Sequence, residues 1–167
     1  MAREIDEAVK WFRKIYLDGI PVVLRQSETS FLSFVCVVAA MDALAGYRFK
    51  NLTRVGDRFS QFVLDYFPPG YSAHAAKLYL FRCRLLHNFS PAYFSLAHAS
   101  PNSHLEASLI GDTTLSDETF FADMRSDSEK YFSDLQSMPQ LRTNMLYRLK
   151  NLEEGGTISV LTIIPPS

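Results

Sequence analysis

The stretch from Leu78 to Phe89 places an arginine on an apolar helical face, and this constrains the fold more than any other feature. At about 100° per residue, four apolar residues lie within roughly 60° of Arg82: Leu78, Leu85, Leu86 and Phe89. The pattern predicts a guanidinium at the centre of a buried stripe. Because an isolated buried charge is strongly unfavourable, Arg82 must meet a carboxylate, a phosphate or a water-filled cleft between subunits.

Asp42 is the predicted partner of Arg82. Residues 31–47 are apolar nearly all round, which predicts the most buried helix, and Asp42 interrupts that pattern. Two opposite charges, each set into an apolar helix, are expected to face a common space. Two interpretations stay open: an ion pair that only fixes helix register, or an Asp42 that orients Arg82 or His87 at a working site.

The whole pattern predicts a mainly α protein, a helical bundle of about six helices with a small antiparallel sheet of about three strands. The expected helices cover 3–17, 31–47, 53–66, a fourth that carries Arg82 and is capped by Ser72, 117–136, and a sixth that runs from Pro139 to Gly155. Residues 20–29 are expected to form a connection, with one of their hydroxyls capping the next helix.

Residues 93–98 and 104–110 predict a hairpin around the turn at 100–103, and residues 157–164 predict a third strand beside it. We expect one domain over residues 1–167. Its first half, 1–90, holds four helices and the arginine, and 91–167 holds the hairpin, two helices and the last strand.

The formal net charge of −1 excludes a strongly basic nucleic-acid binder. Basic residues gather in 48–84 and acidic residues in 112–134, so an anionic ligand is expected on the first region unless both are ordinary solvated faces. Cys36 and Cys83 lie inside apolar helical runs without zinc-site spacing, which predicts reduced core thiols, no metal or cofactor, and a cytoplasmic protein. The longest apolar run, 31–45, is too short to span a membrane and contains Asp42.

The segment Arg82-Cys83-Arg84-Leu85-Leu86-His87-Asn88 resembles the Arg-x4-His motif of HEPN domains, small helical bundles found in many prokaryotic toxin and defence proteins. The flanking KLYLF and HN sequences and the place of the motif late in a four-helix segment agree with the family. Cys83 departs from it, because active members often carry a polar residue there, commonly Asn.

The resemblance implies a metal-independent endoribonuclease in which the motifs of two subunits converge in a cleft at a symmetric dimer interface. The implied partners are an RNA substrate, a second copy of the chain, and an antitoxin or regulatory protein. It also implies a role as a toxin or defence effector.

The residues suit that chemistry. His87, with an ordinary pKa of about 6.5, fits a general base toward a ribose 2'-hydroxyl or a general acid toward the leaving 5'-oxygen. Arg82 fits a bidentate phosphate ligand, and the cleavage would leave a 2',3'-cyclic phosphate. Five residues of separation point the two side chains about 140° apart, so a dimer is expected to be needed. Arg84 is a second phosphate ligand, and Asn88 either positions His87 or caps the helix.

Two other classes of function remain. One is a non-catalytic HEPN-like module that binds a nucleotide or a partner protein through Arg82 and His87. The other is a structural bundle in which Arg82 only pairs with Asp42. A metal site between His98 and His104 would have two ligands without carboxylate neighbours, which is insufficient for zinc.

Overall fold

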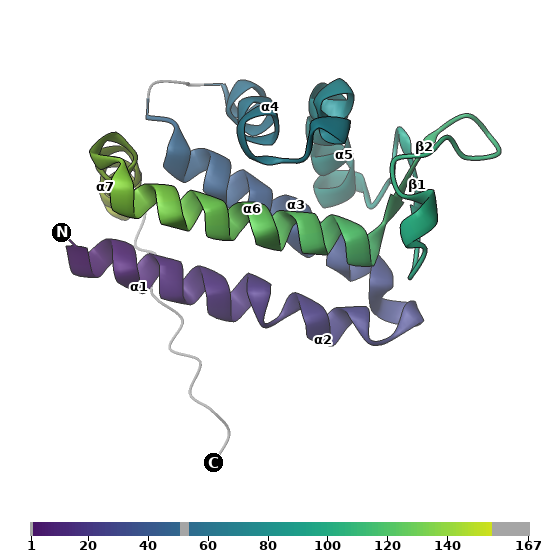
Figure 1. Cartoon of the computed structure of the whole chain (residues 1–167), viewed down its shortest axis with the longest axis horizontal. Helices are drawn as coiled ribbons and strands as arrows, with labels where there is room; N and C mark the ends of the chain where they lie inside the picture. Colours follow the sequence, from purple (N-terminus) through teal and green to yellow (C-terminus); the bar gives the residue numbers. More distant parts are fainter. Residues whose placement is uncertain (1, 51–53, 155–167) are drawn as a thin grey trace, which may run out of the picture.

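A computed structural model describes residues 2–50 and 54–154 of the chain. The helices are α1 (Ala2–Phe12), α2 (Ile20–Leu24), α3 (Ser30–Arg48), α4 (Val55–Tyr66), α5 (Ala75–Asn88), α6 (Asp117–Ser137) and α7 (Pro139–Glu154). Six of them have eleven residues or more in the described part of the chain, which confirms the expected mainly α bundle. Figure 1 shows α1 and α2 along one side of the bundle, α4 and α5 along the other, and α7 at the end opposite the strands.

Helix α3 is the centre of the bundle and packs against α2, α4, α5, α6 and α7. Its buried side includes Phe34, Val38, Met41 and Leu44, each at most 1% exposed. The opposite side stays partly exposed, so α3 is less completely covered than its sequence predicts. The segment Ser27–Arg48 is long and apolar enough to cross a membrane by those two criteria alone, and the core helix of a globular protein satisfies the same criteria.

Aromatic side chains join the helices into one core. The ring of Phe34 lies 6.3 Å from that of Phe120 on α6 and 6.4 Å from that of Phe81 on α5. Phe62 of α4 packs edge-on against Tyr131 of α6, with 6.1 Å between the ring centroids. These contacts fix α4, α5 and α6 around α3, because burying a ring removes a large apolar area from water.

The first part of the chain contains more helix than the sequence predicts. After α1, a π-helical turn continues from Arg13 to Leu17, as expected for the first helix. Residues 20–29, expected as a connection, instead form α2 and a short 3-10 turn, because Pro21 sits in the first turn of α2, where a missing N–H is harmless. Thr29 donates its hydroxyl proton to the carbonyls of Val23 and Gln26, so the expected side-chain cap of α3 is absent.

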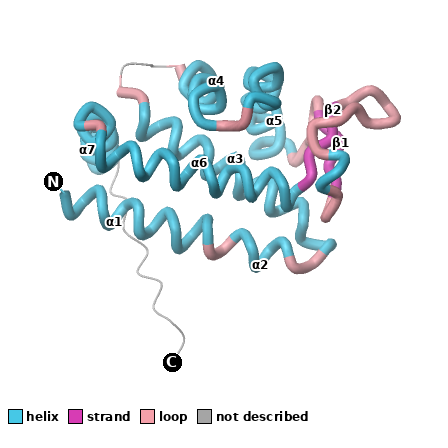
Figure 2. Tube along the Cα trace, viewed as in Figure 1, coloured by secondary structure: helices cyan, strands magenta, loops and turns pink. Residues whose placement is uncertain are grey.

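The predicted antiparallel hairpin is wrong. Strand β1 (Phe94–Ala97) pairs in parallel with β2 (Thr113–Ser116), in the register Phe94 to Thr113, at the end of the bundle beyond α5 (Figure 2). Residues 104–110 form no strand, and only Ala107 makes an isolated antiparallel bridge. The chain at 105–106 instead bonds to β2 through its backbone: Leu105 N–H donates to Thr114 O, and Thr114 N–H donates to Glu106 O. The predicted strand at 157–164 lies outside the described residues.

The remaining helices follow their periodicity. In α6 the predicted stripe is buried: Phe120, Phe121, Met124, Tyr131, Phe132 and Leu135. In α7, Leu141 and Met145 are buried as predicted. Ser72 does not cap α5; it is exposed within a 3-10 turn, Pro69–His74, that precedes the helix.

Candidate functional site

Arg82 and Asp42 form the predicted pair. The Arg82 Nη2 donates to Asp42 Oδ2 at 2.5 Å, and this contact joins α5 to α3. The side chains are 18% and 25% exposed, so the pair lies at the margin between core and solvent. Partial burial lowers the pKa of Arg82, but the hydrogen bond and charge of Asp42 outweigh it and hold the pKa above its ordinary value.

Arg82 does not occupy the centre of the buried stripe, which corrects the sequence prediction. The buried residues of α5 are Ala75, Leu78, Phe81 and Leu85. Phe81 precedes Arg82 by about 100° and draws the centre of the stripe away from it. Phe89, counted as apolar face by the sequence, is 70% exposed. Arg82 therefore lies at the rim of the core, where one side chain can reach both Asp42 and solvent.

Cys83 and Tyr79 lie beside the ion pair. A side-chain interaction with Cys83 is the largest cause that raises the pKa of the Tyr79 hydroxyl, and Cys83 also interacts with Arg82. Both cysteines are free thiols and half-buried, and Cys36 packs against the hydrophobic core. The half-buried Cys83 thiol therefore lies beside both Tyr79 and Arg82.

The other motif residues lie at the exposed end of α5. His87, Arg84 and Asn88 are exposed, and none of their side chains makes a hydrogen bond or ion pair with the described residues. Backbone groups end the helix: Phe89 N–H donates to Leu85 O and Ser90 N–H to Arg84 O. One chain thus holds Arg82 against α3 and leaves His87 in solvent, which agrees with the angle of about 140° between them on a helix.

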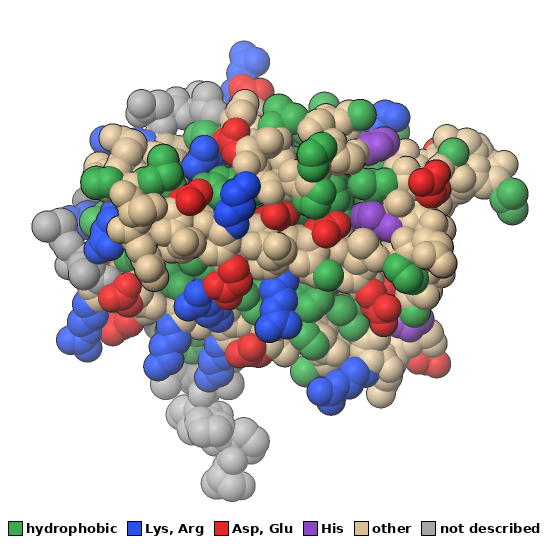
Figure 3. Space-filling view, viewed as in Figure 1, with side chains coloured by type: hydrophobic (Ala, Val, Ile, Leu, Met, Phe, Trp, Pro, Cys, Tyr) green, Lys and Arg blue, Asp and Glu red, His purple; other side chains and the backbone are tan. Residues whose placement is uncertain are grey.

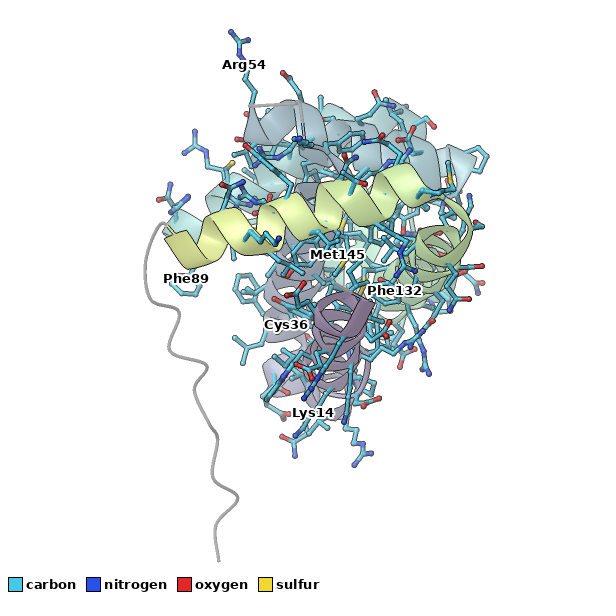
Figure 4. The ribbon with its side chains drawn as sticks, turned by 90° about the vertical axis from the view of Figure 1, so that its left-hand side faces the viewer. Lys14, Cys36, Arg54, Phe89, Phe132 and Met145 are labelled. Atoms are coloured by element: carbon cyan, nitrogen blue, oxygen red, sulfur yellow. The ribbon has the colours of Figure 1, made fainter. Side chains whose placement is uncertain are left out.

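Apolar side chains surround this end of α5. Leu32 on α3 is 47% exposed and Phe89 is 70% exposed, while Phe31, Cys36 and Leu86 are partly buried. We call these five residues the α3–α5 face. The rings of Phe31 and Phe89 lie 6.4 Å apart. Figure 4 shows Phe89 on the opposite side of the molecule from Phe132 of α6, with Cys36 between them.

Phe89 also has an unusual backbone conformation. Its φ is 51°, in the left-handed region that a non-glycine residue enters at a cost of about 1 kcal/mol or more. A bulky, strained and mostly exposed phenylalanine beside His87 adds little to the core of one chain. This left-handed conformation ends α5 and lets the backbone N–H groups of Phe89 and Ser90 bond to the last carbonyls of the helix.

Two arginines that the sequence did not single out for the site lie near the ion pair. Arg148 of α7 passes over Gly46 of α3, with its Nε 3.7 Å from where a β-carbon on Gly46 would stand. Burial lowers the pKa of Arg58 on α4, the charge of Arg148 lowers it further, and Asp42 acts in the opposite direction. Arg58 belongs to the basic region at 48–84, but α7 gave no sequence signal for Arg148.

The other histidines are engaged in separate contacts. His98 Nδ1 lies 2.7 Å from Asp117 Oδ2, while His104 Nε2 lies 2.7 Å from the Tyr71 hydroxyl, which donates to Asp123. They do not converge, and no group of three metal-ligating side chains occurs among the described residues. These contacts hold the segment between β1 and β2 against α6 and the turn before α5.

Several acidic side chains of the region at 112–134 make hydrogen bonds or ion pairs with other residues of the chain. Asp134 accepts a hydrogen bond from Tyr66, and Glu129 pairs with Arg13 at 2.5 Å. Figure 3 shows the face over α1 and α6, where acidic and basic side chains are interspersed rather than separated.

The chain matches no family model, no curated protein and no solved structure. Its fold defines a small, mainly α bundle with a two-stranded parallel sheet.

Proposed function

We propose that the chain is a HEPN-like, metal-independent endoribonuclease of the cytoplasm that works as a homodimer, with Arg82 and His87 as its catalytic residues. The position of Arg82 carries this proposal. A guanidinium at the rim of the core, oriented by Asp42 and 18% exposed, is fixed in direction and still reachable by a phosphate. The arrangement fits the resemblance of the segment at 82–88 to the HEPN motif.

A second copy of the chain is needed because one helix does not bring the two groups together. His87 points about 140° away from Arg82 and is exposed at the end of α5. The α3–α5 face offers apolar surface next to both residues, including Phe89 and Leu32. A symmetric dimer across this face would place the motif of one chain opposite that of the other and cover the apolar side chains.

The proposed reaction needs two proton transfers and no metal. One His87 accepts the proton of a ribose 2'-hydroxyl as that oxygen attacks the phosphorus. The bond from phosphorus to the 5'-oxygen breaks, and the protonated His87 of the second copy donates a proton to the leaving oxygen. Arg82 stabilises the charge on the phosphate oxygens, and the products carry a 2',3'-cyclic phosphate and a 5'-hydroxyl.

A non-catalytic module that binds a nucleotide or a protein is the second candidate. Two observations favour it: Asp42 already neutralises Arg82, and Cys83 replaces the polar residue that active HEPN domains often carry. In that case the same face would serve recognition alone. A role in toxin or defence systems, with an antitoxin or regulatory partner, rests on the resemblance.

The test is cleavage of a mixed single-stranded RNA in EDTA by the wild-type protein and its His87→Ala variant. Lys10→Ala, a change at an exposed lysine of α1 outside the basic region at 48–84, is the matched control. We expect cyclic-phosphate ends from the wild type and the control, and at least a hundredfold slower cleavage by His87→Ala, the lower end of what general acid–base catalysis contributes. Equal cleavage by all three proteins would remove His87 from the mechanism. If the wild-type protein is a folded dimer and cleaves no RNA, the result favours the binding module.

A further inference from the structure

We propose that Arg58 and Arg148 extend the site around Arg82 into a binding track for the phosphate backbone of the RNA, laid across α3 at Asp42 and Gly46. This inference rests on the proposed function, because it names the substrate contacts of the same site. It adds two residues from α4 and α7, outside the segment that resembles the HEPN motif.

Two helices bring arginines to the same strip of α3. Asp42 and Gly46 are four residues apart and share one side of that helix. Arg82 reaches Asp42 from α5 at 2.5 Å. Arg148 crosses Gly46 from α7, with its Nε 3.7 Å from the position of a β-carbon there. Since Gly46 has no side chain, the guanidinium of Arg148 lies close to the α3 backbone, one turn beyond the ion pair.

Arg58 brings a third positive charge from α4. Its guanidinium is half-buried and lies close enough to Arg148, Asp42 and Tyr79 for each of them to change its pKa. Tyr79 holds this side of the cluster in place: its ring packs against Gly56 at the start of α4 and lies 6.0 Å from the ring of Phe59. The three arginines are therefore carried by three helices whose positions the core fixes.

Arg82 and Arg148 together carry two positive charges beside the one negative charge of Asp42. Asp42 pairs with Arg82, and within the described residues Arg148 has no ion-pair partner. Like charges held together in a partly buried place repel each other, and a bound anion relieves that repulsion. Guanidinium groups match the oxygens of a phosphate in two-point hydrogen bonds, and a row of them suits a polymer with one phosphate per nucleotide.

Binding of an RNA that cannot be cleaved tests the track separately from catalysis. The probe is a fluorescent single-stranded RNA with every 2'-hydroxyl methylated, and its anisotropy is followed at several salt concentrations. Arg58→Gln and Arg148→Gln are compared with Arg125→Gln, a change at an exposed arginine of α6. We expect each of the first two to weaken binding about tenfold and to reduce the slope of log affinity against log salt by about 1, with the control within about twofold.

The outcomes of the two tests are distinct. If Arg58→Gln and Arg148→Gln are folded and bind the RNA with the same affinity and salt slope as the wild type, the proposed track is wrong, even if the wild type cleaves RNA. Weaker binding by both variants supports it, even if the wild type cleaves nothing and the ribonuclease proposal fails. Absence of RNA binding by the wild type, or binding of an acidic peptide in its place, also overturns it. Where Arg148→Gln fails to fold, Arg148→Lys keeps the charge, and we expect intermediate affinity with an unchanged salt slope.

Discussion

At the scale of single residues, the chain places charges where burial changes their behaviour. Arg82 is stabilised by Asp42 at the rim of the core, while Asp127 on α6 is only 5% exposed and one of its carboxylate oxygens has no hydrogen-bond partner within the described residues. Asp42 compensates the charge of Arg82, whereas burial favours the neutral form of the Asp127 carboxyl.

Replacing Asp42 by alanine should lower the free energy of unfolding by about 1–3 kcal/mol, between the values typical of exposed and of buried pairs. The loss arises because the Arg82 guanidinium would stay partly buried without its carboxylate. Urea denaturation of Asp42→Ala, Arg82→Ala and the double variant measures it. Additive effects, with no coupling energy, would mean that the pair contributes nothing in solution.

Asp127 should make the protein less stable at alkaline pH. Burial raises its pKa from 3.8 to about 7, so the folded state favours the neutral carboxyl. The folding stability that goes with the neutral Asp127 carboxyl is fully present below about pH 4 and is lost as the pH rises through 7. We expect Asp127→Asn to match the wild type near pH 4 and to be more stable by about 1–3 kcal/mol at pH 8, measured by thermal or urea unfolding. Glu106→Gln, an exposed change, is the control, and a wild-type pH profile in Asp127→Asn would refute the prediction.

At the scale of helices, two glycines show how closely neighbours approach. A β-carbon on Gly56 of α4 would stand 2.7 Å from the Tyr79 ring, whereas one on Gly46 of α3 would meet nothing closer than Arg148 at 3.7 Å. The first contact is a clash and the second is ordinary packing. The same substitution should therefore have opposite effects in the two helices.

Gly56→Ala should destabilise the protein by about 1–2 kcal/mol, because displacing the Tyr79 ring outweighs the gain in helix propensity. Gly46→Ala should stabilise it by about 0.5–1 kcal/mol, since propensity then acts alone. Equilibrium denaturation of both variants gives the comparison. If both stabilise to a similar degree, Tyr79 yields easily and does not fix α4 against α5.

At the scale of the whole molecule, the α3–α5 face is one apolar surface that a single chain leaves uncovered, with Phe89 70% and Leu32 47% exposed. Phe89 is strained as well as exposed, so its replacement need not damage the monomer. Asparagine tolerates the left-handed conformation better than phenylalanine does. Replacing Phe89 by asparagine therefore tests dimer assembly separately from folding of the monomer.

We expect Phe89→Asn to shift the protein from dimer to monomer and to abolish RNA cleavage without lowering the melting temperature. Light scattering after gel filtration measures the mass. Val22→Asn, at a 60% exposed position on α2, is the control and should remain dimeric. A dimeric and active Phe89→Asn protein would place the subunit interface elsewhere.

The sequence by itself determined the six longer helices, but not α2, and it determined the pairing of Asp42 with Arg82. Helix periodicity is local, and it predicted α3, α4, α6 and α7 to within about two residues at the ends that the structure describes. The pairing could be foreseen because a charge on an apolar helix has few permitted surroundings. The same reasoning overestimated how deeply Arg82 is buried, since Phe81 draws the core to its own side of α5.

Only the tertiary structure decided the sheet and the basic cluster. The parallel pairing of β1 with β2 depends on distant contacts, such as that of His98 with Asp117, which local patterns do not encode. Likewise Arg82 of α5 reaches Asp42 and Arg148 of α7 reaches Gly46 because the core fixes how those two helices pack on α3. Proximity between residues so far apart in the chain is a property of packing, and packing involves the whole fold at once.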